Sequence, residues 1–178
     1  MKKKALITGI NGQDGTYLFY FLIKKKYNVY GIEKKTKKNK KKKKIKKKIK
    51  IIKTDITNFH SLKKIIRSIN PHEIYNLAAI SSVGSSFEKP INTLDVNCRG
   101  LLNILEIVKQ FNKKIKIYQA SSSEMYGNSE NYRIDETAKF APTSPYAISK
   151  QTSFKLVKVY RDNFNLNCVT GVLFNHES

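Results

Sequence analysis

Tyr146 and Lys150 have the spacing of a catalytic pair in this 178-residue sequence. On a helix, residues four positions apart lie on the same face. A lysine ammonium near a tyrosine hydroxyl favours the phenolate and lowers the pKa of the tyrosine. Such a tyrosine can take a proton from a substrate hydroxyl while a hydride leaves the carbon that bears it. The same spacing also occurs by chance, so its meaning depends on the elements around it.

A run of three serines and one carboxylate, from Ser121 to Glu124, follows an apolar segment that we predict to be a strand. The Ser122 hydroxyl can hold the substrate oxygen that Tyr146 deprotonates. Glu124 can work as a second acid or base on a different carbon. The alternative is that Glu124 caps a helix or forms a local ion pair.

Three glycines separate the first predicted strand from the first predicted helix. A glycine turn there lets backbone N–H groups approach a pyrophosphate, and the helix N-terminus adds partial positive charge. The spacing is Gly-x-x-Gly-x-x-Gly, which alone could mark a plain turn. In its strand–turn–helix context it predicts a dinucleotide site made by Gly9, Asn11, Gly12, Gln13, Asp14 and Gly15.

The residues after the second predicted strand point to two different cofactors. Glu33 stands about 20 residues beyond the glycine turn, where an acid usually binds the ribose of NAD. Lys34 and Lys35 would instead suit the additional phosphate of NADP. A third interpretation is that all three residues are solvated ends of a basic loop.

Short apolar segments alternate with segments of helical periodicity along the whole sequence. The predicted strands are residues 5–8, 28–32, 49–52, 73–79, 115–120 and 168–174. Helices are predicted from Gly15, from Thr57 or Asn58 to Pro71, around Leu101–Val108 after a loop containing Pro90, and from Tyr146. This order predicts an α/β fold, a Rossmann-like doubly wound parallel sheet with helices on both faces. In such sheets ligands bind beyond the carboxyl ends of the strands, where all the clusters above fall.

Length and composition narrow the class of protein. The length suggests one domain, and 40% hydrophobic residues are enough for a core. Cys98 and Cys168 form neither a disulfide framework nor a metal-binding motif, so no metal site is expected. The apolar runs are too short for a membrane span or a signal peptide. A cytoplasmic protein is therefore expected.

The net charge of +22 is concentrated in one tract. Between Lys34 and Lys50 there are 13 lysines in 17 residues and no acid. A nearly pure lysine run is typical of a solvated loop, which could touch polyanions without sequence preference. Because the whole sequence is rich in Lys, Asn and Ile, compositional drift also explains it.

These motifs together resemble those of the extended short-chain dehydrogenase/reductase superfamily, and within it those of the GDP-mannose 4,6-dehydratases. The stretches that carry the resemblance are residues 5–15, 73–79, 85–90, 118–124, 144–150 and 173–178. Other nucleotide-sugar enzymes are less similar. A 4-epimerase would not need Glu124, and the dTDP-glucose dehydratases place an aspartate where Ser123 stands.

The resemblance implies a role for each matched residue. Tyr146 would be the base for oxidation at C4, with Lys150 holding the cofactor ribose and Ser122 standing where a threonine is usual. Glu124 would remove the C5 proton and help expel the C6 hydroxyl as water, and NADPH would return the hydride to C6. Asp55 and Ile56 would flank the adenine. Further cofactor contacts would come from Leu77, Ala78, Ala79, Ser81 and His176, and substrate contacts from Ser81, Ser85, Ser122, Glu124, Tyr146 and Asn175.

The resemblance also sets expectations for the cofactor, partners and domains. It implies NADP rather than NAD, GDP-mannose as substrate, and a homo-oligomer formed through helices of the cofactor domain. Residues 1–178 would be the NADP-binding domain, with the lysine-rich loop 34–50 inside it. The smaller domain that grips the guanine nucleotide is missing, so we expect little or no turnover from the isolated chain. Alternatives are a 4-epimerase or reductase, and a partner subunit that binds NADP without catalysis.

Overall fold

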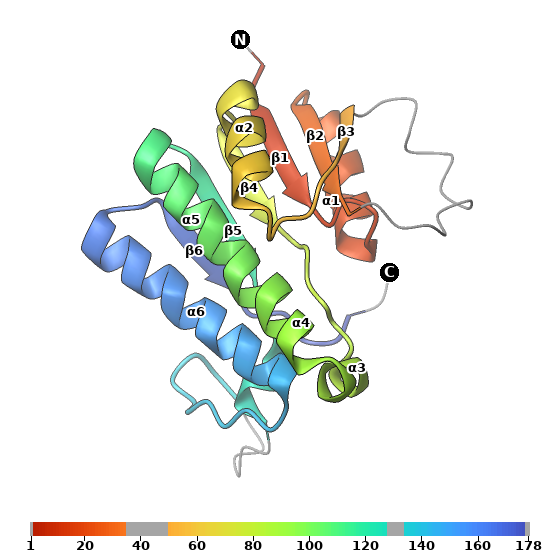
Figure 1. Ribbon diagram of the computed structural model, residues 1–178, viewed down its shortest axis with the longest axis vertical. Helices are drawn as coiled ribbons and strands as arrows, with labels where there is room; N and C mark the ends of the chain where they lie inside the picture. Colours follow the sequence, from red (N-terminus) through yellow and green to blue (C-terminus); the bar gives the residue numbers. More distant parts are fainter. Residues whose placement is uncertain (1, 35–49, 128–133, 177–178) are drawn as a thin grey trace.

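Six parallel strands form one sheet in the computed structural model, which describes residues 2–34, 50–127 and 134–176 (Figure 1). The strand order is β3-β2-β1-β4-β5-β6. The order reverses between β1 and β4, which is the switch point of a doubly wound sheet. The strand bounds are β1 Lys4–Thr8, β2 Asn28–Glu33, β3 Lys50–Lys53, β4 Glu73–Asn76, β5 Lys116–Ala120 and β6 Cys168–Gly171. The predicted Rossmann-like α/β fold is confirmed.

Helices connect these strands and cover the two faces of the sheet. They are α1 Gln13–Lys24, α2 Phe59–Ile69, α3 Val83–Glu88, α4 Pro90–Leu94, α5 Gly100–Phe111 and α6 Pro145–Phe164. A π-helical turn, Asp95–Arg99, joins α4 to α5, and a 3₁₀ turn, Ser123–Tyr126, follows β5. None of the helices in the described ranges is long and apolar enough to span a bilayer.

The alternation of side chains along β1 divides the core into two layers. Leu6 packs on one face with residues of α2, α5 and α6. Ala5 and Ile7 point to the other face, where they pack with Phe19 and Leu22 of α1. Figure 1 shows α5 and α6 side by side over β4, β5 and β6. The sheet is therefore a rigid platform whose carboxyl edge carries the loops that matter for function.

Local capping explains where two of the helices begin and end. The Asn58 side chain accepts a hydrogen bond from the Ser61 N–H at the start of α2, so the predicted cap falls on Asn58 rather than Thr57. Asn70 adopts the left-handed conformation that ends the helix, directly before Pro71. Ser144 caps α6, and Pro145 occupies its first turn.

Some predicted boundaries were wrong. The strands predicted over 73–79 and 168–174 end at Asn76 and Gly171, because the residues that follow leave the sheet and most of them line a cavity. Pro90 was predicted to lie in a loop, but it begins α4, where its missing N–H costs nothing. Helix α1 begins at Gln13, two residues before the predicted start. Most of the lysine-rich segment, residues 35–49, lies outside the described residues.

Candidate active site

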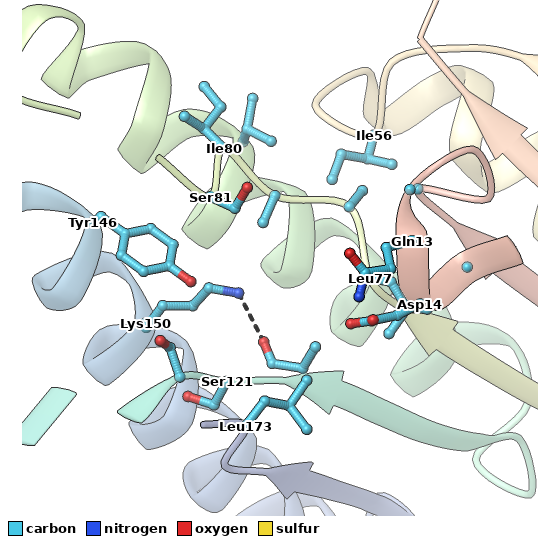
Figure 2. Close-up of a pocket in the computed structure, with 18 of the residues that line it drawn as sticks. Gln13, Asp14, Ile56, Leu77, Ile80, Ser81, Ser121, Tyr146, Lys150 and Leu173 are labelled. Atoms are coloured by element: carbon cyan, nitrogen blue, oxygen red, sulfur yellow. Dashed lines mark hydrogen bonds between the residues drawn. The ribbon is translucent and has the colours of Figure 1, made fainter. Parts of the chain in front are cut away.

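A cavity of about 660 Å³ opens at the carboxyl edge of the sheet, within the size range of small-molecule sites. Loops after all six strands contribute to it, as the parallel topology requires. Figure 2 shows Tyr146 and Lys150 on one side of this cavity, and Gln13, Asp14 and Leu77 on the other. The predicted residues on its wall are Gly9, Gly12, Gln13, Asp14, Gly15, Glu33, Lys34, Asp55, Ile56, Leu77, Ala78, Ala79, Ser81, Ser122, Tyr146, Lys150, Asn175 and His176.

The glycine turn has a geometry that side chains would destroy. Gly9 has a φ of +68°, and a Cβ there would lie 2.8 Å from the Ala78 nitrogen. A Cβ on Gly15 would lie 2.5 Å from the Gly9 carbonyl oxygen, so the two glycines allow α1 to pack closely against the turn. The Gly12 N–H donates to that same carbonyl at 2.9 Å. These contacts fix the turn at the mouth of the cavity.

The N-terminus of α1 differs from those of α2, α3 and α6. Those three helices are capped by the side chains of Asn58, Ser82 and Ser144. The cap residue of α1 is Gly12, which has no side chain to accept from the first-turn N–H groups. Because this helix end lines the cavity, its N–H groups and dipole suit a pyrophosphate. The glycine turn and the N-terminus of α1 therefore fit the pyrophosphate of a dinucleotide.

Charged residues from two neighbouring loops pair with one another at the β2–β3 side of the cavity. The Lys34 Nζ lies 2.8 Å from Asp55 Oδ2. Partial burial would raise the pKa of Asp55, but hydrogen bonds from Lys34 and Thr57 outweigh it and lower that pKa below its ordinary value. The Asn11 side-chain amide donates to the Glu33 carboxylate. A carboxylate and an ammonium thus stand together where either an NAD ribose or an NADP phosphate would bind.

Tyr146 lies at the first turn of α6 with 7% of its surface exposed. Burial raises the pKa of its hydroxyl, a hydrogen bond with Ser122 lowers it, and the Glu124 carboxylate raises it again, for a net increase. Ser122 and Glu124 are thus the two side chains that influence the ionisation of the Tyr146 hydroxyl. The expected lowering of the Tyr146 pKa is wrong for this structure, because desolvation dominates.

Lys150 is nearly enclosed, with 4% of its surface exposed. Its Nζ donates to the Ala120 carbonyl oxygen at 2.9 Å, the bond drawn as a dashed line in Figure 2. The Nζ also lies 5.6 Å from the centre of the Tyr146 ring. Desolvation lowers the pKa of Lys150 to about 8. The ammonium therefore sits between the tyrosine and the end of β5, on the wall of the cavity.

The π-helical turn holds α6, the helix of Tyr146 and Lys150, in place. The Asn97 amide donates to Ser149 Oγ at 2.8 Å and to the Ile80 carbonyl, and its carbonyl oxygen accepts from the Ile80 N–H. Ser153 donates to the Asn97 backbone carbonyl at 3.0 Å. Asn97 thereby links the loop after β4 to α6. The helical periodicity of this region hid Asn97, because a buried asparagine in an apolar helix carries no distinctive spacing.

The segment after β6 crosses to the glycine turn. The His176 Nε2 lies 3.0 Å from Asp14 Oδ1, and its Nδ1 lies 2.8 Å from the Phe174 carbonyl oxygen. These two contacts raise the pKa of His176, the Phe174 carbonyl contributing most. His176, predicted to touch the nicotinamide end of a cofactor, lines the cavity and contacts Asp14 in the first turn of α1. Asn175 beside it also lines the cavity.

Three predicted site residues that the structure describes are not on the cavity wall. Asn11 bonds Glu33, Ser85 lies in α3, and Glu124 lies in the 3₁₀ turn that Ser122 caps. Lys35 lies outside the described residues. The wall also includes residues that sequence reasoning did not assign to the site: Ile32, Thr54, Ile80, Val96, Ala120, Ser121, Leu173 and Phe174. These residues belong to no motif in the sequence that would assign them to a site.

Comparisons with known proteins identify the family to which the chain is similar. A model of the GDP-mannose 4,6 dehydratase family matches residues 6–178. A GDP-mannose 4,6-dehydratase of Vibrio cholerae is 40% identical over 100% of this chain and 51% of its own length. A GDP-mannose 4,6 dehydratase of Dictyostelium discoideum is 43% identical over 99% of this chain and 53% of its own. The chain thus spans about half the length of these relatives.

Solved structures show the same architecture. A UDP-glucose 4-epimerase of Thermus thermophilus in complex with NAD superposes with a TM-score of 0.83 at 27% identity, over 94% of this chain and 53% of its own. A dTDP-glucose 4,6-dehydratase of Bacillus anthracis in complex with NAD gives 0.79 at 25% identity, over 96% and 54%. With the family match over nearly its whole length, the chain belongs to the GDP-mannose 4,6-dehydratase family.

Proposed function

We propose that this chain is the cofactor-binding and catalytic half of a nucleotide-sugar dehydratase. The reaction would convert GDP-mannose to GDP-4-dehydro-6-deoxymannose, with the net loss of one water. Because the chain spans about half of its relatives, the remaining substrate contacts would come from a part equivalent to their second half. We propose accordingly that residues 1–178 form the NADP-binding domain.

The observation that carries the proposal is the grouping of Ser122, Glu124 and Tyr146 beside the dinucleotide cavity. The hydrogen bond between Ser122 and Tyr146 gives a hydroxyl pair that can hold a sugar oxygen. Glu124 follows two residues after Ser122, close enough for its charge to act on the tyrosine. A cofactor domain that only bound a dinucleotide would not need a carboxylate at this point.

Each of these side chains has a distinct task in the proposed reaction. Tyr146, as the phenolate, takes the proton of the C4 hydroxyl while Ser122 holds the oxygen in place. A bound nicotinamide would accept the hydride from C4 and later return it to C6. Glu124 takes the C5 proton, made acidic by the neighbouring C4 ketone, and donates a proton to the C6 hydroxyl as it leaves as water. Lys150 keeps a positive charge beside the tyrosine, which favours its phenolate form.

The cofactor is proposed to be NADP, held by the glycine turn and by Lys34. Glu33 beside Lys34 leaves NAD as the alternative, since a carboxylate there suits the ribose hydroxyls. A cytoplasmic setting is proposed from the two cysteines, which form no disulfide framework. A homo-oligomer through the helices is supported by exposed apolar side chains on α4 and α6: Ile91, Leu94 and Ile148 are 78%, 41% and 46% exposed. Polyanion contact through residues 34–50 remains a prediction.

The test uses a chimera in which residues 1–176 replace the equivalent half of the Vibrio cholerae relative. The chimera is incubated with GDP-mannose and NADP, and the sugar nucleotide is weighed by mass spectrometry. The proposal expects a product lighter by one water, which Glu124→Gln abolishes. The isolated chain should bind NADPH and give little or no product. A folded chimera that binds NADPH and yields a product of unchanged mass would contradict the proposal and favour an epimerase.

A further inference from the structure

A row of polar side chains crosses the sheet just below the cavity. Thr8, Asn76 and Gln119 occupy matching register positions on β1, β4 and β5. They are 0%, 1% and 3% exposed, among side chains that are otherwise mostly apolar. Buried polar groups in folded proteins are hydrogen-bonded, so the partners of these three side chains define what the row connects.

The hydrogen bonds in this row run in one direction. The Thr8 hydroxyl donates to Asn76 Oδ1 at 2.6 Å, which turns the Asn76 Nδ2 toward Gln119. That Nδ2 donates to Gln119 Oε1 at 2.6 Å, so the Gln119 Nε2 must point the other way. It donates to the Ala120 carbonyl oxygen at 2.8 Å. The orientation of each amide is thus fixed by the one before it.

The row ends on the atom that holds Lys150. The Ala120 carbonyl oxygen accepts from both the Gln119 Nε2 and the Lys150 Nζ, at 2.8 and 2.9 Å. At its other end, Thr8 Oγ1 accepts from the Ala78 N–H at 3.1 Å, in the loop that lines the cavity after β4. The row therefore connects two walls of the cofactor cavity through the interior of the sheet.

We propose that Gln119 is a positioning residue for Lys150, and that the row of Thr8, Asn76 and Gln119 fixes the Ala120 carbonyl that orients the lysine ammonium. The lysine side chain is long and could adopt many rotamers, and a carbonyl at the last residue of a strand could turn away from it. The Ala120 carbonyl cannot turn away in this manner, because the Gln119 amide inside the sheet also donates to it. The inference rests on the proposed function only in that Lys150 serves the cofactor and Tyr146.

The test observes Lys150 directly in the protein without cofactor. Lysine labelled with ¹⁵N is incorporated, the Lys150 Nζ signal is assigned by its loss in Lys150→Met, and its titration is followed by NMR. Within the described ranges, the titratable groups that face Lys150 are Tyr146 on its own helix and Cys98 on the π-helical turn. Since neither changes in the variants below, a shift in the titration midpoint reports on Gln119.

Two variants of Gln119 are expected to shift this midpoint in opposite directions. Gln119→Met frees the Ala120 carbonyl and weakens its bond to the ammonium, so the midpoint falls by about half a pH unit, or threefold in proton affinity. Gln119→Glu places a carboxylate near the Lys150 ammonium, with only the Ala120 carbonyl oxygen between them. The negative charge favours the protonated lysine, so the midpoint rises. Thr170→Val is the control, because Thr170 is the next residue in the same register row and, among the described residues, its hydroxyl has no partner.

The outcomes separate a positioning role from a merely structural one. If Gln119 only fills the core, Gln119→Met lowers thermal stability and leaves the Lys150 midpoint where it is, which would overturn the proposal. If Gln119→Met does not fold, an unchanged midpoint in Gln119→Glu overturns it equally. Failure of the proposed function would look different, because a wild-type chain that binds neither NADPH nor NADH can still show the predicted titrations.

Discussion

The Lys34 ammonium and the Asp55 carboxylate, 2.8 Å apart, join the loop after β2 to the loop after β3. The sequence assigned these residues to opposite ends of an adenosine, one to a phosphate and the other to the base. In the structure each is the other's partner. Since the Lys34 side chain is 58% exposed, this ion pair is weak and the ammonium can turn toward a ligand.

Lys34 should therefore decide between the two cofactors. Lys34→Ala is expected to weaken NADPH binding about tenfold, the value of one charge-assisted hydrogen bond, and to leave NADH binding unchanged. Fluorescence titration of the isolated chain measures both affinities. The exposed Lys53 on β3 is the matched control, and Lys53→Ala should change neither. Equal losses of affinity for NADPH and NADH would show that Lys34 does not bind the additional phosphate of NADPH.

Gly9 and Gly12 should respond differently to the same substitution. Gly9→Ala forces a side chain into a positive φ and against the Ala78 backbone, so it should destabilise the fold by about 2 kcal/mol or more. At Gly12, the nearest protein atom to an added Cβ is the Gly9 oxygen at 3.2 Å. Gly12→Ala should keep its melting temperature and lose at least tenfold in NADPH affinity. If a folded Gly12→Ala protein kept its NADPH affinity, the pyrophosphate would have to bind at a place other than the glycine turn.

The buried ammonium of Lys150 should cost stability at neutral pH. The pKa of this side chain is about 8 in the folded chain, against 10.5 for an unhindered lysine. Between those values the unfolded chain binds more protons, so stability rises with pH across that window and the penalty is fully present below pH 8. Lys150→Met should thus stabilise the chain by about 1–3 kcal/mol at pH 7, and by less at pH 10.

Urea unfolding at the two pH values measures this difference. Lys155→Met is the control, because Lys155 is exposed on the same helix. The Lys150→Met protein should at the same time lose cofactor affinity. A destabilised Lys150→Met protein at pH 7 would mean that the ammonium is well compensated in its site.

The hydroxyl of Ser122 should tune the base. Its hydrogen bond lowers the pKa of Tyr146, so Ser122→Ala should raise that pKa and move the acidic limb of the pH–rate profile to higher pH. We also expect the rate to fall by about 10- to 100-fold, since the substrate oxygen loses a partner. Ser122→Thr keeps the hydroxyl and should retain most of the activity. The chimera described above provides the assay. If the pH–rate profile of Ser122→Ala did not shift, the Ser122 hydroxyl would not influence the pKa of Tyr146.

The sequence predicted those parts of the molecule that follow from hydrophobic periodicity and from the positions of glycine residues. The alternation of strands and helices was enough for the sheet, and Gly9, Gly12 and Gly15 marked the turn. The places where strands end were harder, because Leu77, Ala78 and Ala79 continue the apolar pattern of β4 while their backbone has already left the sheet. Pro90 misled for a related reason, since proline both ends and begins helices.

The electrostatics of the site could not be read from spacing. The Tyr146–Lys150 pattern predicts a shared face, which α6 provides. It does not reveal that Lys150 is enclosed and bound to the Ala120 carbonyl, nor that burial raises the pKa of Tyr146. Both depend on how far β5 extends beneath α6. Asn97 and Gln119 were missed because single buried amides have no motif, although they fix the positions of α6 and Lys150.

The most direct test of the account follows one atom through the proposed reaction. GDP-mannose labelled with deuterium at C4 is given to the chimera with unlabelled NADP, and the product is examined by mass spectrometry and NMR. The account predicts a product lighter by one water that carries the deuterium at C6, and no such product from Glu124→Gln. Deuterium lost to solvent, or a labelled sugar nucleotide of unchanged mass, would contradict the assignment of these residues to an internal hydride transfer.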